Sequence, residues 1–477
     1  MINILIRKKN DMDESLQTHQ NRRQLIEIIL ITFPTIIEFT LQTLVNYADF
    51  IMVGRLGIEA SATIGITNEV TFMVKAATNA LGVGILAFVA KEYGAGKKDI
   101  INLSAYKAYE LGIITGVVTT VICLVISSYL PVFLGAEEAI RKPASMYFAI
   151  CSSTSVFYSM NVAASSLRKA TKDMKSPLIV NGMVNILNII LNYFLIYQTS
   201  DIQLFGKTVR LYRAGLGVQG AAIGTALSIA AGGIIMLIVN ERYKESAATV
   251  LTGSYISAHK NEGKSISQKY IAVGLPAFLT TFVTCLGRII FTKMIVPMGT
   301  TIYAAHTIAF TAESVFYMPV AGMGTAIASL SGNVKGEGNL KKLNRQTNLV
   351  CVITFCVMVV SSLILLTCAE WIIALFTQDS DVLAIAPKLL YIVAINEPIF
   401  GVGMVMQYIF EGIGKTKPPL YASFFAQWAI RVAGTYIFVY RLGYGIYTAW
   451  FCMIADNIVK SIILYILYWK YNDRLMD

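Results

Sequence analysis

Apolar stretches long enough to cross a lipid bilayer recur through the whole sequence. A helix needs about 20 consecutive, mostly apolar residues to span the hydrocarbon core once. Residues 111–136, 144–167 and 349–369 each reach that length without a charged side chain. Charged residues make up 14% of the chain, whereas soluble proteins carry about 25%, and the mean hydropathy is +0.62. The chain is therefore predicted to be an all-α integral membrane protein.

Length and apolar periodicity predict twelve transmembrane helices. In the first half of the chain they are expected at residues 27–54, 60–90, 103–133, 144–168, 177–198 and 217–240. In the second half they are expected at residues 270–297, 302–333, 346–376, 388–411, 418–440 and 443–469. The helices form an N-terminal half at 27–240 and a C-terminal half at 270–470, joined by a polar linker at 241–269. Polar tails at 1–26 and 471–477 complete the predicted organisation.

Basic residues gather in alternate loops, and this asymmetry predicts the orientation of the chain. The clusters lie in the loops at 91–98, 168–175, 242–269, 335–345 and 415–417, and the main exception is the basic loop at 199–217. Cytoplasmic loops carry the excess of Lys and Arg, so we expect a multi-pass protein of the plasma (inner) membrane with both termini cytoplasmic. This placement also explains the net charge of +11 without a nucleic-acid partner.

The two halves resemble each other at a fixed offset of 242 residues. The shared positions are Pro34 with Pro276, Gly57 with Gly299, Gly82 with Gly324, Gly94 with Gly336 and Gly96 with Gly338. Because Gly and Pro set backbone geometry, these matches indicate two copies of one helical fold. Six spans per half predict two six-helix bundles related by a pseudo-twofold axis along the membrane normal. Asp49 is matched by Phe291, so the copies differ in chemistry.

The first predicted span carries polar groups that lipid cannot satisfy. Glu38 and Asp49 are eleven residues apart, close to three helical turns, and Asn46 lies one turn from Asp49 on the same face. A carboxylate at membrane depth costs about 2.5–3.5 kcal/mol on insertion scales, so such a residue is a functional candidate by default. The alternative is that these groups only link helices by hydrogen bonds, which we favour for Glu38 and disfavour for Asp49.

A stripe of amides follows one face of the fifth predicted span. Asn181, Asn185, Asn188 and Asn192 are spaced by four, three and four residues, which places them on one side of the helix. Each amide offers two donors and an acceptor, so the stripe suits either a cation site or contacts with a neighbouring helix. Interhelical bonds of this kind contribute only about 0.6 kcal/mol on average in membranes, and four in a row exceed what helix association requires.

Several short motifs then indicate a family. YADFIMVGRLG ends the first predicted helix, NIILNYFLIY lies in the fifth and GVQGAAIGTALS in the sixth. SLRKATKDMKSP and EGIGKTKPP follow the fourth and tenth helices as related loops, and QWAIR and ADNIVK lie in the eleventh and twelfth. In this order, over residues of about 27–470, the motifs resemble the multidrug and toxic compound extrusion (MATE) family of prokaryotic transporters.

The resemblance implies cation-coupled antiport and a coupling site. The essential acid of that family falls on Asp49, and its partners fall on Asn188, Asn192 and Thr225. The family has an aspartate where this chain has Asn192, so the site keeps one acid. A Na⁺ site would lose a hard anionic ligand, although the four side chains still offer oxygen atoms. Coupling to H⁺ and coupling to Na⁺ both stay open, and no other cofactor is expected.

Other intramembrane polar residues are secondary candidates. They are Asn46, Glu38, Asn185, Glu397, His306 and Glu313. Glu397 precedes Pro398 at an expected bend in the tenth span and is a candidate for a C-terminal proton or substrate site. His306 lies two turns from Glu313 on the same helix face and is interpreted as a hydrogen-bonded core histidine.

The remaining intramembrane charges are interpreted as ion-pairing groups. Asp456 and Lys460, one turn apart, are expected to pair with each other. Glu69, Lys75 and Arg288 are likewise expected to pair and not to take part in transport.

Function classes other than transport are disfavoured by the sequence. It contains no HExxH, no GxSxG and no P-loop, so neither an enzyme nor internal ATP hydrolysis is indicated. The seven cysteines all lie in apolar segments without a CxxC pair, which excludes a recognisable zinc site. No segment offers an output domain for a membrane sensor or scaffold, which is the least favoured alternative.

The sequence therefore favours an antiporter, driven by H⁺ or Na⁺, that exports organic, often cationic, compounds by alternating access. Its expected partners are a small organic substrate and the lipid bilayer, and we expect it to act as a monomer. The alternative is a flippase of lipid-linked precursors with the same overall fold. Such flippases line the cavity with Arg and Lys, whereas the cavity candidates in this sequence are mainly acids and amides.

Overall fold

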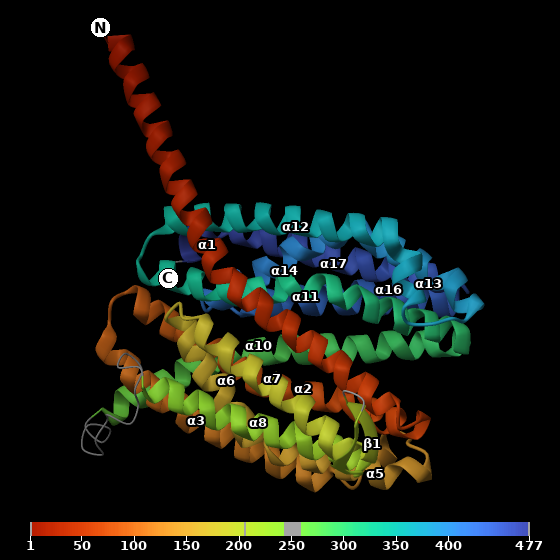
Figure 1. Ribbon diagram of the computed structural model, residues 1–477. Helices are drawn as coiled ribbons and strands as arrows, with labels where there is room; N and C mark the ends of the chain where they lie inside the picture. Colours follow the sequence, from red (N-terminus) through yellow and green to blue (C-terminus); the bar gives the residue numbers. More distant parts are fainter. Residues whose placement is uncertain (1, 205–206, 243–258, 476–477) are drawn as a thin grey trace.

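The computed structural model describes residues 2–204, 207–242 and 259–475, and within them the chain is almost wholly helical (Figure 1). The N-terminal half contains α1 (Ile2–Gly54), α2 (Ile58–Gly94), α3 (Lys98–Ile126), α4 (Leu130–Phe133), α5 (Glu138–Ser153), α6 (Ser155–Ala170), α7 (Lys175–Ile196) and α8 (Gly217–Glu241). The C-terminal half contains α10 (Lys260–Ile295), α11 (Thr300–Gly336), α12 (Leu340–Ala374), α13 (Ser380–Ala394), α14 (Glu397–Gly412), α15 (Lys417–Phe425), α16 (Ala433–Thr435) and α17 (Ile446–Lys470). Most of the predicted linker, residues 243–258, lies outside the described residues.

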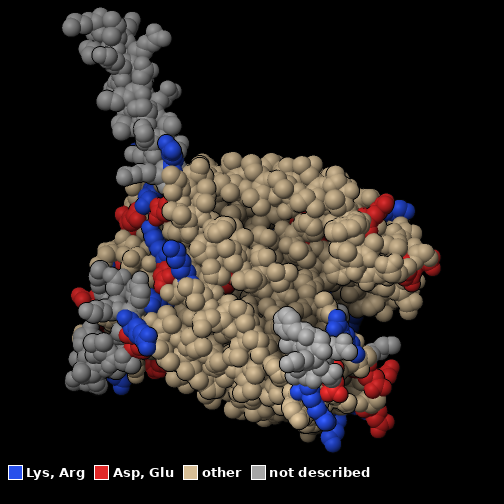
Figure 2. Space-filling model, in the orientation of Figure 1, with Lys and Arg blue, Asp and Glu red and all other residues tan. Residues whose placement is uncertain are grey.

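The predicted number of spans agrees with this arrangement. Among the described residues, nine helices are long and apolar enough to cross a membrane, and the bent pair α13 and α14 makes a tenth. The two remaining predicted spans correspond to α5 with α6, and to α15 with the π-helical turns on both sides of α16. Figure 2 shows charged side chains gathered at the two ends of the molecule, with a broad uncharged band between them. An uncharged band of this kind is what contact with lipid requires.

Several boundaries differ from the predicted ones. α1 is one helix from Ile2 onward, where a polar tail was expected up to residue 26. The predicted span 103–133 is interrupted between α3 and α4, and the predicted span 144–168 is interrupted at Thr154 between α5 and α6. The basic loop at 199–217 forms an antiparallel hairpin of β1 (Gln198–Leu204) and β2 (Lys207–Ala214). β-branched residues favour extended backbone, and the strands contain Thr199, Ile202, Thr208 and Val209.

The expected bend in the tenth span is present. α13 and α14 meet at an angle of 58° around Asn396. Pro398 occupies the first turn of α14, where its missing N–H would have no partner in any case, and its ring prevents the preceding helix from continuing through it. The bend places Glu397 at the start of a helix in the middle of the C-terminal half.

Backbone geometry confirms the internal repeat. Gly57 and Gly299, which are 242 residues apart, have φ angles of 120° and 117°. Lys172 has a φ of 64°, and its equivalent Gly414 has a φ of 75°. Positive φ angles are rare outside glycine, so their recurrence at one offset identifies equivalent turns in the two halves.

The halves touch most closely near the end of the bundle where α1 begins and α17 ends, which we call the termini end (left in Figure 1). A side chain on Gly94 would overlap the Asn333 carbonyl, and a side chain on Gly336 would overlap the Lys91 carbonyl. These two contacts are equivalents under the 242-residue offset, so a pseudo-twofold axis passes between α2 and α11. At the opposite end, which we call the far end, a recess separates the halves in Figure 2.

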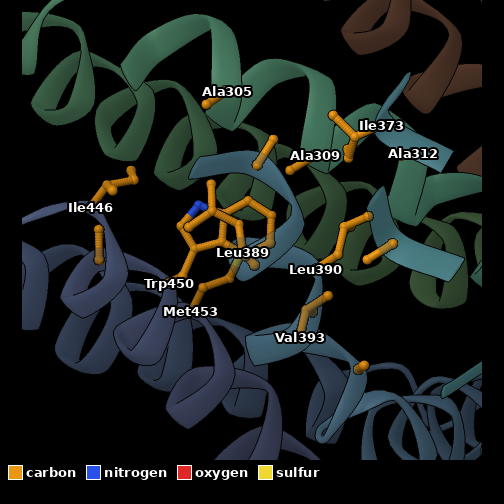
Figure 3. Close-up of a cluster of buried hydrophobic side chains, with 14 of the residues drawn as sticks. Ala305, Ala309, Ala312, Ile373, Leu389, Leu390, Val393, Ile446, Trp450 and Met453 are labelled. Atoms are coloured by element: carbon orange, nitrogen blue, oxygen red, sulfur yellow. The ribbon is translucent and has the colours of Figure 1, made fainter. Parts of the chain in front are cut away.

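Each half has its own apolar core. In the C-terminal half, Trp450 and Met453 of α17 pack against Leu389 and Val393 of α13, with the alanines of α11 beside them (Figure 3). Small residues on α11 let the helices approach closely. The cores hold the helix faces that line the cavity between the halves.

Candidate functional site

A cavity of about 750 Å³ lies between the two halves. Its N-terminal wall is formed mainly by α1, α2, α6, α7 and α8, and its C-terminal wall by α10, α11, α14 and α17 with the segment around Arg431. α1 faces the cavity at Glu38, Gln42, Asn46 and Asp49, which are the successive turns of one face. The polar face predicted for the first span therefore looks into the cavity.

The four side chains predicted for the coupling site lie together. Asn192 Nδ2 donates to Asp49 Oδ1 at 2.8 Å. The Asn188 amide is oriented so that its nitrogen faces Asp49 and its oxygen faces Thr225. The nitrogen donates to both Asp49 oxygens, at 2.9 and 3.1 Å, and the oxygen accepts from Thr225 Oγ1 at 3.3 Å. Asn188 and Asn192 are buried, whereas Asp49 is partly exposed to the cavity. Two amides of α7 thus hold one carboxylate of α1.

Gly224 of α8 is a site residue that the sequence analysis did not single out. A Cβ on Gly224 would overlap Asn192 Oδ1. The absence of a side chain lets α8 press against α7 at the amide that holds Asp49, and it places Thr225 beside Asn188. Gly220 and Gly224 are four residues apart in GVQGAAIG, a spacing typical of close helix contact, but this spacing does not identify the partner helix or residue.

The termini end of the cavity is closed by a second polar cluster. Glu38 accepts from Lys169 Nζ at 3.0 Å and from Asn181 Nδ2 at 2.7 Å. This ion pair supports the helix-linking alternative for Glu38. Asn181 in turn accepts from Asn161. Asn46 and Asn185 line the cavity between this cluster and Asp49.

The C-terminal half contains two buried carboxyl groups near each other. Glu397 is 0% exposed, and neither of its oxygens has a hydrogen-bond partner among the described residues. Glu313 of α11 is 4% exposed and lines the cavity. The two groups interact electrostatically, and Arg431 adds an opposite charge near Glu313. The secondary candidates Glu313 and Glu397 therefore form one acidic pair on the opposite side of the cavity from Asp49.

The predicted pairing of Asp456 with Lys460 is wrong, because Asp456 has a different first partner. Asp456 Oδ2 lies 2.6 Å from Arg431 Nε. Arg431 comes from the QWAIR motif and Asp456 from the ADNIVK motif, so the two motifs meet in the fold. Arg431 also lies over the Phe291 ring, 5.7 Å from its centroid. Lys460 keeps only a longer-range interaction with Asp456 and Glu411.

His306 is placed in the apolar core and does not line the cavity. Its Nδ1 accepts from Trp450 Nε1 at 3.2 Å, and its ring packs against Phe291. His306 and Glu313 share a helix, but the described cavity wall includes only Glu313. The interpretation of His306 as a hydrogen-bonded core histidine agrees with these contacts.

Acids and amides outnumber bases in the described cavity wall, as expected, but basic side chains that the sequence analysis did not place there line it as well. The described wall contains five acids, Glu38, Asp49, Glu313, Glu411 and Asp456. It also contains five bases, Lys75, Lys169, Arg288, Arg431 and Lys460. The bases were missed because single charges scattered over separate helices give no local pattern.

Comparison with known proteins decides the family. A family model described as MatE matches residues 34–194 and again residues 276–437. The second match begins 242 residues after the first, which is the offset found between the glycine and proline pairs. Together the matches cover more than half of the chain. The chain belongs to the MatE family. The resemblance predicted from the motifs is thereby confirmed, as are the twelve helices in two bundles that this family of multi-pass membrane transporters shares.

Individual relatives agree with the family over nearly the full length. The chain is 27% identical over 451 residues to the "Probable multidrug resistance protein NorM" of Thermotoga maritima, covering 94% of this chain and 93% of the relative. It is 23% identical to the "Uncharacterized transporter YisQ" of Bacillus subtilis, covering 91% and 92%. A solved structure described as the outward-facing conformation of a multidrug resistance MATE family transporter superposes with a TM-score of 0.85, at 23% identity, over 95% of this chain and 96% of that one.

Proposed function

We propose that this protein is a cation-coupled antiporter that exports organic compounds through the central cavity by alternating access. One observation carries the proposal. Asp49 is a partly exposed carboxylate on the cavity wall, held by two amides that come from another helix. The MatE family and the multidrug resistance names of the relatives support an exporter of this kind.

The geometry around Asp49 suggests how ion binding changes the structure. The ionised carboxylate accepts hydrogen bonds from Asn188 and Asn192, which link α1 to α7. A protonated carboxyl carries its own donor and loses acceptor capacity, so proton binding weakens this link. The bound proton also neutralises the carboxylate and so weakens the binding of a cationic substrate beside it. Proton and substrate are therefore coupled reciprocally through one site.

The donors around Asp49 favour the proton over sodium. Both carboxylate oxygens face amide N–H groups, and a sodium ion needs oxygen ligands where these hydrogens point. Asn192 Oδ1 is the neighbouring buried oxygen without a described hydrogen-bond partner, and one neutral oxygen beside one carboxylate is a poor cation site. We therefore expect the proton gradient to drive export.

The contacts between the halves suggest which state the structure represents. The halves meet closely at the termini end through α2 and α11 and separate at the far end. With cytoplasmic termini, as the basic loops predict, this is an outward-facing state in the plasma membrane. Both cavity walls come from one chain, so we expect a monomer to be sufficient for transport.

The flippase alternative now has one observation in its favour, the five basic side chains in the cavity wall. Three of these basic side chains, however, lie near acidic side chains. Lys169 pairs with Glu38, Arg431 pairs with Asp456, and Lys460 lies in the field of Asp456 and Glu411. These pairs leave no continuous positive surface for a pyrophosphate. The MatE model also matches in both halves, and we therefore prefer the exporter.

Reconstituted liposomes with separate gradients provide the test. A fluorescent organic cation is loaded, and its movement is followed with a pH gradient alone, a sodium gradient alone, and neither. Export driven by the pH gradient and unaffected when choline replaces sodium is the expected result. If export collapses in choline at fixed pH, the coupling ion is sodium and not the proton. If neither gradient moves any organic probe, the proposal is overturned.

A further inference from the structure

Lys75 is a basic residue of the cavity wall whose charge has no close acidic partner among the described residues. Its Nζ lies 5.6 Å from the centre of the Tyr158 ring. Within the part of the chain that the structure describes, it forms no ion pair within 4 Å and no hydrogen bond. Asp49 interacts with it only at longer range. The sequence-based expectation that Lys75 serves as an ion-pairing group is therefore not supported by its contacts.

The next turn of α2 supplies a second donor. Asn79 lies four residues after Lys75 and lines the same cavity, so the two side chains project from one face. Asn79 Oδ1 accepts from the Tyr158 hydroxyl at 3.0 Å. The amide nitrogen of Asn79 makes no hydrogen bond among the described residues, which leaves two N–H donors for a ligand. An ammonium and an amide on the same helix face can both donate hydrogen bonds to one anionic group such as a carboxylate.

The surroundings of this pair favour an aromatic acid. Tyr158 packs beside Lys75, and the exposed Phe72 lies one turn before it on the cavity face of α2. Arg288 of the opposite wall lies 5.6 Å from the centre of the Phe72 ring. Aromatic faces of this kind bury flat rings in binding cavities. Both rings line the cavity beside cationic side chains, so an aromatic acid would find apolar surface and positive charge on the same part of the wall.

Charge balance across the N-terminal wall indicates a second charge on the ligand. Glu38 and Lys169 neutralise each other, so Asp49 and Lys75 are the two remaining charges of that wall. A substrate with only a positive charge would be attracted by Asp49 and repelled by Lys75. A substrate with a positive and a negative group satisfies both.

We propose that Lys75 and Asn79 form an anion subsite that binds the carboxylate of a zwitterionic aromatic substrate, whose cationic group faces Asp49. This inference rests on the proposed export function, since it names the class of compound that enters the cavity. It also gives α2 a role distinct from that of α1: α1 binds the coupling cation, and α2 selects the substrate by its negative group.

A matched pair of dyes tests the subsite. Rhodamine 6G is an ethyl ester with a single positive charge, and its free acid carries the same ring system with an added carboxylate. Equilibrium binding of both dyes to the purified full-length protein is measured by fluorescence polarisation at fixed pH. The wild-type protein is expected to bind the free acid more tightly than the ester. Tighter binding of the ester would overturn the proposal.

Variants of α2 identify the group responsible. Lys75→Gln is expected to weaken binding of the acid by about tenfold or more, the usual effect of losing a hydrogen bond between charged groups, and to leave the ester unchanged or tighter. Lys75→Arg should retain the preference for the acid, and Asn79→Leu should reduce it. Lys293→Gln is the matched control because Lys293 is exposed and does not line the cavity. Equal effects of Lys75→Gln on both dyes, or no effect on either, would overturn the proposal.

Transport of the ester separates this inference from the proposed function. If the ester is exported while Lys75 has no influence on the acid, the subsite fails and the exporter stands. If the acid binds in a Lys75-dependent way but neither dye moves with any gradient, the subsite stands and the exporter fails.

Discussion

Asp49 in the N-terminal half accepts hydrogen bonds from two asparagines, whereas Glu397 in the C-terminal half is fully buried with no described hydrogen-bond partner for either oxygen. The position equivalent to Asp49 in the C-terminal half is Phe291, whose ring packs beneath Arg431 and against His306. The two halves share one helical fold but contain different acidic sites. The first is a single carboxylate held by amides and open to the cavity, and the second is a pair of buried carboxyl groups, of which Glu313 lines the cavity near Arg431 and Glu397 has no described hydrogen-bond partner.

The difference has an energetic consequence. A carboxylate that accepts amide hydrogen bonds is stable in its charged form, while a buried charge without partners costs several kcal/mol. The Glu397 carboxylate therefore needs a bound proton or cation to compensate its burial, whereas Glu313 has the charge of Arg431 nearby. Under the proposed antiport mechanism, we expect the N-terminal site to change its occupancy in each transport cycle and the C-terminal pair to keep its ion until the halves move apart.

The largest expected effect is that of Asp49→Asn. Removing the single acid of the N-terminal cluster should reduce gradient-driven export to background, because no acid remains in that cluster to bind the coupling ion. Folding should be retained, since an amide fits the same space and the amides of α7 keep partners. Efflux from liposomes is measured together with the melting temperature. Near-wild-type efflux in a stable variant would show that the C-terminal pair alone couples transport.

Gly224→Ala should have the next largest effect. The added methyl group overlaps Asn192 Oδ1 and must displace the amide that holds Asp49, and overpacking of this kind costs about 1–3 kcal/mol. We expect export to fall by about tenfold, as a loss of roughly 1.4 kcal/mol implies. Gly182→Ala on α7 is the control, because nothing lies within 4 Å of the added group there. Equal efflux by both variants would show that the position of Asn192 has no role.

Glu397→Gln tests the C-terminal site directly. If the acidic pair takes part in the cycle, its loss should slow export by a few-fold and shift the pH optimum, because two interacting carboxyl groups titrate as a unit. Glu313→Gln should then produce a similar change, since each variant leaves one carboxyl group. Efflux is measured across a series of pH values at constant gradient. A pH profile identical to that of the wild type would leave Asp49 as the only coupling acid.

Asn192→Asp should have the smallest effect on rate and the clearest effect on ion choice. The substitution places a second carboxylate beside Asp49, where two like charges are stable only with a cation between them. A hard cation prefers two anionic oxygens, so this variant should gain a sodium-dependent rise in thermal stability that the wild type lacks. The melting temperature is compared in sodium and choline buffers. Sodium stabilisation of the wild type to the same extent would contradict proton coupling.

The sequence by itself determined the architecture of this protein. Stretches of apolar residues that match the thickness of a bilayer predicted the spans, because a helix is the structure in which one segment satisfies its own backbone in lipid. Glycine and proline at an offset of 242 residues predicted the repeat, because their backbone constraints survive when side chains diverge. Helical spacing placed Asn188 and Asn192 on one face, and the motif resemblance joined them to Asp49 and Thr225.

The tertiary structure alone decided which helix faces meet. Nothing local in the sequence showed that Arg431 pairs with Asp456, that Gly224 presses on Asn192, or that Lys75 faces the cavity without an acid beside it. Each of these features depends on how helices that are far apart in the chain lie against each other. A helix's own sequence fixes the direction of its side chains, but the rotation and depth at which it packs against its neighbours depend on all the contacts of the fold together.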